Sequence, residues 1–301
     1  MAILKVDTIS GIGTEGPVFE GDIEFTSQNF LTLPNGDTTQ RGRGRGFIAS
    51  GFVSPTQSNA INFLNIQSSG NTEDFGDLTV AKYALGSGAS STRGIFHGGY
   101  LPSSSPDTDI NSIEFITIAT QGNATDFGDR TVVGRNPSAA SSSTRVVMAA
   151  GHPSPNSYTD TIDFITTATT GNASDFGNLL SATNAMCNAN NSPTRGIFSG
   201  GNQPSSPYNQ NVIQFVTMAS TGNAADFGDI FTGRYSVSSC SNSNRAVFLG
   251  GRTTSPSVVY YNAMEFVTIS TTGNTSDFGD ITGATGGTNA GAANSDSHGG
   301  L

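Results

Sequence analysis

The arginines of this sequence are informative, because the 301 residues include only 13 lysines and arginines. Five arginines open successive stretches of similar sequence: Arg45, Arg93, Arg145, Arg195 and Arg245. The planar guanidinium group suits a bidentate hydrogen bond to a carboxylate. We therefore predict that each arginine pairs with an aspartate of an Asp-Phe-Gly-Asp segment and forms a repeated structural contact. The alternative is a ring of arginines that binds anions.

Aspartate and phenylalanine recur with these arginines in the tripeptide Asp-Phe-Gly. Its five copies contain Asp74, Asp126, Asp175, Asp226 and Asp277, followed by Phe75, Phe127, Phe176, Phe227 and Phe278. In protein kinases this tripeptide binds metal, but neither a glycine-rich phosphate loop with its lysine nor a catalytic-loop motif accompanies it here. We predict a structural role, in which phenylalanine fills the space between units, aspartate holds the backbone and glycine permits a bend.

Other combinations of residues give weaker indications of a catalytic or metal site. Asp126 and Asp129 could bind calcium, but calcium takes about six to eight oxygen ligands. In the third unit the residue equivalent to Asp129 is Asn178, so the pair of carboxylates is not repeated there. The three histidines lack the spacing of metal ligands: His97, His152 and His298. There is no nucleophile-elbow sequence, although a serine–histidine–aspartate triad is defined in space. We predict no catalytic residue, no metal site and no cofactor.

A Gly-Asn pair also recurs in every unit. At Asn123, Asn172 and Asn274 it forms a glycosylation sequon, but Asn71 and Asn223 keep the same position without the serine or threonine. The pattern therefore preserves the asparagine and not the sequon. We expect Gly-Asn to form a tight hairpin turn.

Composition excludes several classes of protein. The net charge of −10 is unfavourable for nucleic-acid binding, which needs clustered cations. No apolar run of about 18 residues exists, so we expect no membrane insertion. We also expect no signal peptide, because no apolar run follows a basic N-terminal segment. The short basic run at 41–45 is interpreted as a flexible hinge.

The sequence consists of repeated units, and the arginines that open successive units are 48 to 52 residues apart. The strands of each unit must position the residues described above. In one unit, an apolar strand at 93–97 ends in a double glycine, and further strands are expected at 113–118, 126–133 and 139–143. Four strands per unit, repeated five times, predict an all-β fold, a five-bladed β-propeller over residues 45–301. The repeats lie near 45–92, 93–144, 145–194, 195–244 and 245–301. The end of the chain, 297–301, resembles the start of another unit, so we predict closure by pairing of the two ends.

The loops after the double glycines differ most between units, at 52–60, 100–111, 152–160, 202–211 and 252–262. They carry proline, serine and tyrosines that we expect to be exposed: Tyr100, Tyr158, Tyr208, Tyr260 and Tyr261. Variable loops on a rigid scaffold commonly carry binding functions, and tyrosine offers contact area with a polar group. These loops are candidates for contact with protein or sugar; the alternative is that they are merely tolerated.

The double glycine after an apolar strand, repeated about every 50 residues, resembles the kelch motif of β-propellers over residues 45–301. The kelch pattern also has a later tyrosine and tryptophan. This chain contains no tryptophan and uses the phenylalanines of Ile-Glu-Phe and Asp-Phe-Gly instead. The propeller is therefore better supported than the kelch family.

The N-terminal stretch, roughly 1–46, carries the runs 3–9, 25–33 and 34–37. It resembles the leader of virion structural proteins in tailed phages of marine cyanobacteria. The resemblance implies a docking arm, residues 1–44, with these candidate contacts: Ile3, Val6, Ile9, Phe25 and Phe30.

The resemblance further implies a non-enzymatic virion protein of the tail or tail fibre, assembled in the host cytoplasm and present in several copies. Its partners would be other virion proteins, with host-surface glycan or protein as a further partner. The alternatives are a glycan-binding recognition head, a propeller enzyme acting on polysaccharide, and an intracellular kelch-type scaffold.

Overall fold

The computed structural model describes residues 45–53, 56–65, 69–101, 108–153, 157–184, 186 and 190–282. All of them belong to one of the two units into which the chain divides, Thr39–Leu301. Their regular structure consists of β-strands alone, which confirms the all-β prediction. The predicted docking arm (1–44) and the predicted closing segment (297–301) lie outside the described residues.

The strands form five antiparallel sheets, the blades of a five-bladed β-propeller. Blade 1 contains β1 (Arg45–Val53), β2 (Thr56–Asn65) and β3 (Glu73–Asp77). Blade 2 contains β4 (Gly86–Ala89), β5 (Arg93–His97), β8 (Ser112–Thr117) and β9 (Thr125–Asp129). Blade 3 contains β10 (Ser138–Ser141), β11 (Arg145–Ala149), β12 (Thr159–Thr166) and β13 (Ser174–Thr183).

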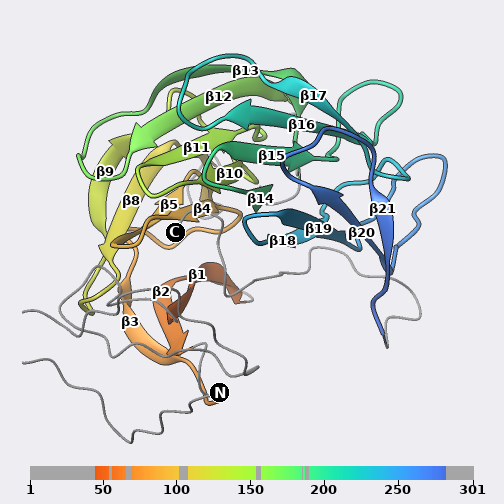
Figure 1. Ribbon diagram of the computed structural model, residues 1–301. Helices are drawn as coiled ribbons and strands as arrows, with labels where there is room; N and C mark the ends of the chain where they lie inside the picture. Colours follow the sequence, from red (N-terminus) through yellow and green to blue (C-terminus); the bar gives the residue numbers. More distant parts are fainter. Residues whose placement is uncertain are drawn as a thin grey trace, which may run out of the picture. The chain divides into compact units, whose positions relative to one another are not determined.

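The two remaining blades repeat this arrangement. Blade 4 contains β14 (Asn190–Asn191), β15 (Arg195–Ser199), β16 (Val212–Thr217) and β17 (Ala225–Asp229). Blade 5 contains β18 (Ser238–Ser241), β19 (Arg245–Leu249), β20 (Ala263–Thr268) and β21 (Ser276–Asp280). A short ribbon of β6 (Tyr100–Leu101) and β7 (Thr108–Asp109) lies in one loop. Figure 1 shows the inner strands β4, β10, β14 and β18 facing a common centre.

The small-residue strand of each unit belongs to the following blade, which corrects the sequence prediction. We expected 139–143 to close the unit that begins at Arg93, but β10 pairs with β11, with Ser138 opposite Ala149. Inner strands approach the neighbouring blade closely: a Cβ added to Gly88 would lie 2.8 Å from Val146 Cγ1. Only small side chains fit there, which explains the Gly, Ala and Ser of these strands.

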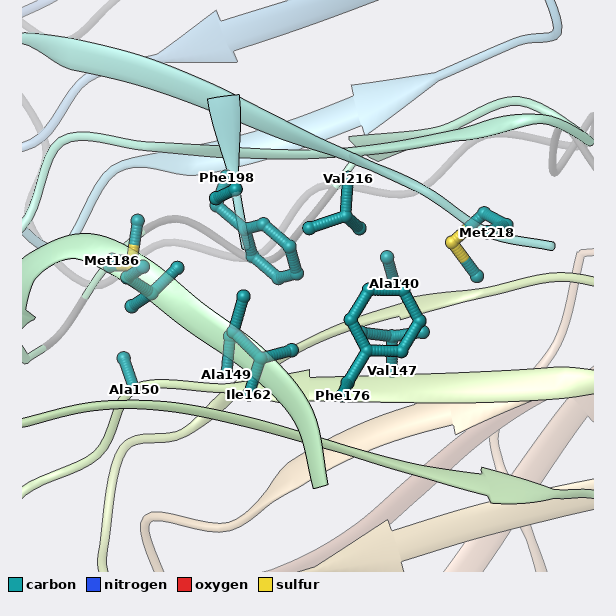
Figure 2. Packing of buried hydrophobic residues seen from close by; sticks show 12 residues of the cluster. Ala140, Val147, Ala149, Ala150, Ile162, Phe176, Met186, Phe198, Val216 and Met218 are labelled. Carbon is teal, nitrogen blue, oxygen red and sulfur yellow. The ribbon is translucent and has the colours of Figure 1, made fainter. Parts of the chain in front are cut away.

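The hydrophobic core lies between the blades. Figure 2 shows the interface of blades 3 and 4, where Val147, Ile162 and Phe176 face Phe198 and Val216, each at most 2% exposed. Both faces of each central strand therefore carry apolar residues. Burial of one such side chain contributes about 1.5–3 kcal/mol, so the interfaces supply much of the stability of the propeller.

Asp-Phe-Gly lies at a β-bulge in every outer strand. In blade 2, Ile113 pairs with Gly128 and Glu114 pairs with Asp126, which leaves Phe127 as the extra residue, buried against blade 3. A Cβ on Gly128 would lie 2.5 Å from the Gly171 carbonyl of blade 3. The predicted roles of phenylalanine and glycine are thus confirmed at the first four copies.

The aspartate and the last copy behave differently. Phe278 is 49% exposed, whereas its four equivalents are 2–3% exposed. Asp277 Oδ1 accepts a hydrogen bond from the N–H of Gly279 at 3.3 Å. The other four aspartates of the tripeptide are exposed and, in the described part of the chain, make no such bond. For these four, the prediction that aspartate holds the backbone is wrong.

Candidate functional site

The first four of the five repeated arginines bind the next blade through a carbonyl oxygen and not through a carboxylate. Their Nη1 atoms donate to backbone carbonyls at 2.6, 2.8, 3.1 and 2.9 Å, in the pairs Arg45–Ile118, Arg93–Thr167, Arg145–Met218 and Arg195–Ile269. Each guanidinium also lies over a phenylalanine of its own blade, for example Arg93 at 4.4 Å from the Phe115 ring centroid. The predicted pairing with Asp-Phe-Gly-Asp is therefore wrong among the described residues, but the first four arginines do make a repeated structural contact, and this contact joins neighbouring blades.

The asparagine of Gly-Asn is a second inter-blade contact. Asn123 Oδ1 accepts the N–H of Asp77 in the preceding blade at 3.0 Å, and the equivalent bond recurs at Asn172, Asn223 and Asn274. The chain reversal itself occurs earlier, where the N–H of Thr120 bonds to the carbonyl of Thr117. The prediction that Gly-Asn forms the turn is thus wrong. The side chain instead holds the outer edge of the neighbouring blade, where an exposed strand edge would otherwise remain.

A third inter-blade contact is a buried polar pair. Lys82 Nζ lies 2.5 Å from Glu114 Oε1, Arg130 Nη2 lies 3.3 Å from Asp163 Oδ1, and Arg234 Nη2 lies 2.7 Å from Glu265 Oε1. In each pair the second carboxylate oxygen accepts a hydrogen bond from a backbone N–H at 2.8–2.9 Å. That N–H belongs to the segment that connects the preceding blade to the blade of the carboxylate, which we call a link. Both side chains of every pair are at most 1% exposed.

Between blades 3 and 4 the same two positions are both neutral. Gln214 replaces the acid and accepts the N–H of Leu180 at 2.8 Å, while Thr183 replaces the base and bonds to the Asn202 carbonyl at 3.0 Å. Charge is therefore present on both members of the contact or on neither: between blades 2 and 3, where Gly134 occupies the base position, Arg130 supplies the cation from four residues earlier. This matching is expected, because an unpaired buried charge is strongly destabilising.

Gly99 and Gly251, the second glycines of two double glycines, lie in a crowded place beside the base: a Cβ there would lie 3.1 Å from the Tyr83 carbonyl oxygen and 2.8 Å from Val237 Cγ2. A Cβ on Gly99 would lie 3.4 Å from Lys82 Cδ, and one on Gly251 would lie 3.4 Å from Arg234 Cδ. Both glycines also have positive φ, +118° and +93°, which a residue with a side chain rarely adopts. The second glycine is thus required by its backbone conformation and by the close approach of the segment that leads to the next blade, a reason that the sequence did not reveal.

The described residues contain no group of three His, Cys, Asp or Glu placed to hold a metal ion. His97, in β5, is fully buried, and both ring nitrogens lack a hydrogen-bond partner. Burial, together with the positive charges of Arg130 and Lys82, lowers the pKa of His97 well below its ordinary value. His97 is therefore a neutral core residue. Within the described part of the chain, no helix is long and apolar enough to cross a membrane.

The variable loops and the links between blades emerge on the same face of the propeller, because neighbouring strands are antiparallel. Of the candidate tyrosines, Tyr208 and Tyr260 are exposed, by 45% and 44%. Tyr261 is partly buried, with the Arg234 guanidinium 5.5 Å from its ring centroid. The exposed aromatic surface of the candidate loops thus gathers at blades 4 and 5.

The other two candidate tyrosines are less exposed. Tyr100 is only 8% exposed, so the prediction of its exposure is wrong: it packs against Tyr83 at 5.3 Å, and Arg135 lies over its ring. Tyr158 is partly buried and donates its hydroxyl to Asn202 Oδ1 at 2.8 Å.

Two hollows lie on this loop face. A groove of about 410 Å³ lies between the loops of blades 4 and 5 and is lined by Tyr208, Asn209, Val259 and Tyr261, among others. A polar pocket of about 330 Å³ is lined by residues from the links after blades 2, 3 and 4 and by residues after two double glycines. The links lead to the inner strands, so this pocket lies towards the axis. We call these hollows the tyrosine groove and the axial pocket.

Sequence reasoning missed the axial pocket. Its lining includes Asn202 and Arg252, which occupy the first position after the double glycine in their units. Tyr100 and His152 occupy the same position in units 2 and 3. The available signal was the variation at this one position, which follows a glycine in every unit.

Comparison with known proteins supports the fold. No protein-family model and no curated protein matches the chain. The solved structure of YjhT superposes with a TM-score of 0.65 over 87% of this chain and 89% of that chain, at 8% sequence identity. At that identity the likeness shows a shared β-propeller architecture and nothing about activity.

Proposed function

We propose that this chain is a non-enzymatic structural protein of a tailed-phage virion, whose propeller presents its loop face to a partner. The observation that carries the proposal is the exposed apolar and aromatic surface at blades 4 and 5. Tyr208, Val258, Val259 and Tyr260 are 43–55% exposed, and Tyr208 and Val259 line the tyrosine groove. Clustered aromatic side chains with polar groups are typical of contact surfaces.

The use of the charged residues supports a presenting role over a catalytic one. The buried carboxylates of Glu114, Asp163 and Glu265 are each held by a cation and a backbone N–H. A hydrolytic site would need carboxylates free to face a substrate across a cleft. The inter-blade contacts instead make a rigid support on which loops of different sequence can be displayed.

The location in the virion rests on the resemblance of residues 1–46 to phage leaders. The proposal assigns Ile3, Val6, Ile9, Phe25 and Phe30 to contacts with another virion protein of the tail or tail fibre. A segment of this length with phenylalanine and isoleucine has little room to build a core by itself, which suits a segment that orders on its partner. We expect several copies per virion, in a number that follows the symmetry of the virion part to which the arm binds.

Quantitative mass spectrometry of density-purified virions tests this location. We expect the chain in a small copy number that follows the rotational symmetry of the tail. Hundreds of copies per particle would contradict the tail location. Absence of the chain from purified particles would overturn the virion function altogether.

Phage adsorption to host cells tests the role of the loop face. Virions carrying the double variant Tyr208→Ser/Tyr260→Ser should adsorb at least about tenfold more slowly, because the central aromatic contacts dominate such interfaces. Ile48→Ser is the matched control, since Ile48 is 53% exposed on blade 1, outside these loops. Equal adsorption by the double variant and the control would refute a contact role for this surface.

A glycan-binding recognition head is the second candidate function. It is favoured by the axial pocket beside the tyrosine groove, where polar and aromatic groups lie together. The two functions are compatible, because a virion protein can carry the recognition head.

A further inference from the structure

The axial pocket contains the one basic side chain outside the repeat register that lacks an acidic partner among the described residues. Five described cations fall outside that register, and four of them pair with a carboxylate: Lys82, Arg130, Arg135 and Arg234. The fifth is Arg252, for which the described part of the chain provides no ion pair. A guanidinium without a carboxylate in a chain of net charge −10 is available to an anion from outside.

Arg252 is held in place at the edge of the pocket. Its backbone N–H and carbonyl exchange hydrogen bonds with Tyr235, both at 3.0 Å. Its guanidinium carbon lies 4.9 Å from the Tyr235 ring centroid, and its buried Nε has no hydrogen-bond partner. The arginine is therefore positioned by stacking, and no described group pairs with its Nη atoms, so less conformational entropy is lost when these bind a carboxylate.

Amide groups complete the pocket. Asn184 Oδ1 is buried without a hydrogen-bond partner, so it can accept a bond from a ligand hydroxyl. The Tyr158 hydroxyl occupies Asn202 Oδ1, which leaves the amide nitrogen of Asn202 as a donor. The pocket thus offers a cation, an acceptor and a donor within about 330 Å³. A sugar that carries a carboxylate beside its hydroxyls has the complementary groups.

The tyrosine groove continues from the axial pocket. Thr253 lines the groove and Thr254 lines the pocket, and Thr254 Oγ1 lies 3.3 Å from Asn209 Oδ1 of the groove. A carboxylate carries one negative charge on two coplanar oxygens, which a single guanidinium can bind in a bidentate contact. A carboxylate on a hydroxyl-rich chain therefore fits a single arginine beside an aromatic groove.

We propose that the axial pocket binds the carboxylate of a uronic acid in a surface polysaccharide, with neighbouring sugars lying along the tyrosine groove. The inference rests on the glycan-recognition form of the proposed function and names its ligand class. Arg252 binds the carboxylate, Asn184 and Asn202 bind ring hydroxyls, and Tyr208 and Tyr261 contact the next sugars.

Isothermal titration of the full chain with matched trisaccharides tests the proposal. Trigalacturonate and galactotriose share their axial and equatorial hydroxyls but differ in the carboxylates. We expect trigalacturonate to bind at least about tenfold more tightly, since a charge-assisted bidentate contact is lost with the neutral sugar. Arg252→Gln should remove this preference, and Arg252→Lys should keep part of it because the charge remains. Val258→Ala, outside both linings, should bind as the unaltered chain does.

Specific results would overturn the inference. Equal binding of the acidic and neutral sugars, or acid binding unchanged in Arg252→Gln, would show that Arg252 does not select a carboxylate. No millimolar binding of trigalacturonate, triglucuronate or trimannuronate would exclude uronic acids as the class. Equally tight binding of a triglutamate peptide would exclude sugar selectivity.

Two controls keep these outcomes interpretable. Unchanged melting temperature and circular dichroism of Arg252→Gln would show that the variant is folded, as expected for a side chain without hydrogen-bond partners. The titration uses the isolated chain, so absence of the protein from virions would overturn the virion location and leave the sugar result unaffected.

Discussion

The neutral pair between blades 3 and 4 allows a direct test of charge matching. Gln214→Glu places a carboxylate where Glu114 and Glu265 lie in other blades. It keeps the acceptor for the N–H of Leu180, but the position occupied by Lys82 or Arg234 in two other contacts holds the neutral Thr183. Gln214 is 3% exposed, so water cannot solvate the new charge. Removing the partner of a buried charge costs about 3–5 kcal/mol, and we expect a loss of about 3 kcal/mol because one hydrogen bond remains.

The measurement is thermal and urea unfolding followed by circular dichroism. A loss of about 3 kcal/mol lowers the melting temperature by about 6–12 °C in a domain of this size. Burial raises the pKa of the new carboxyl above its ordinary value, so the folded state takes up the proton first as pH falls. The penalty is therefore full at neutral pH and disappears below the ordinary pKa of glutamate.

A second substitution supplies the missing base. Thr183→Lys recreates the Lys82–Glu114 pair, and Gly201 provides the same space that Gly99 gives to Lys82. Alone, Thr183→Lys should also destabilise the fold. The double variant Gln214→Glu/Thr183→Lys should be more stable than the sum of the single effects by at least about 2 kcal/mol. A loss below about 1 kcal/mol in Gln214→Glu, or strictly additive single effects, would refute the matching argument.

Three further substitutions test other contacts. Arg195→Ala should lower the free energy of unfolding by about 1–2 kcal/mol, because it removes the hydrogen bond to the Ile269 carbonyl. Arg245→Ala should cost less, because Arg245 has only its ring contact in the described part of the chain. Equal losses in thermal unfolding would contradict the inter-blade role of these arginines. Asn223→Ala should lower the free energy of unfolding by about 0.5–1 kcal/mol, because it removes the bond to the N–H of Asn178. Asn71→Ala should cause the same loss if blade 1 closes on blade 5 as predicted. An Asn71→Ala variant as stable as the unaltered chain would argue against closure through this contact. His97→Leu should gain stability relative to the unaltered chain as pH falls from 7 to 5. The pKa of His97 is lowered in the folded state, so unfolding of the unaltered chain takes up a proton and becomes more favourable at low pH. A difference in melting temperature that does not change with pH would exclude this linkage.

Local patterns predicted the blades well because each strand depends on its own residues. The β-branched and aromatic residues of Ile113–Ile118, the double glycine and the five copies of Asp-Phe-Gly indicated strand positions and the number of units. The burial of Phe75, Phe127, Phe176 and Phe227 between blades followed from the same repeat. The assignment of the small-residue strand failed, because membership of a blade depends on which edge the strand pairs with and not on its own residues.

The sequence by itself determined that the arginines, asparagines and glycines of this protein occupy equivalent places in five units. Only the tertiary structure decided their partners: the carbonyl of Ile269 for Arg195, the N–H of Asn178 for Asn223, and Lys82 Cδ above Gly99. It also separated the exposed Tyr208 from the buried Tyr100 and exposed the unpaired Arg252. The physical reason is that a repeat shows which positions share an environment, whereas partners across an interface depend on how two blades pack.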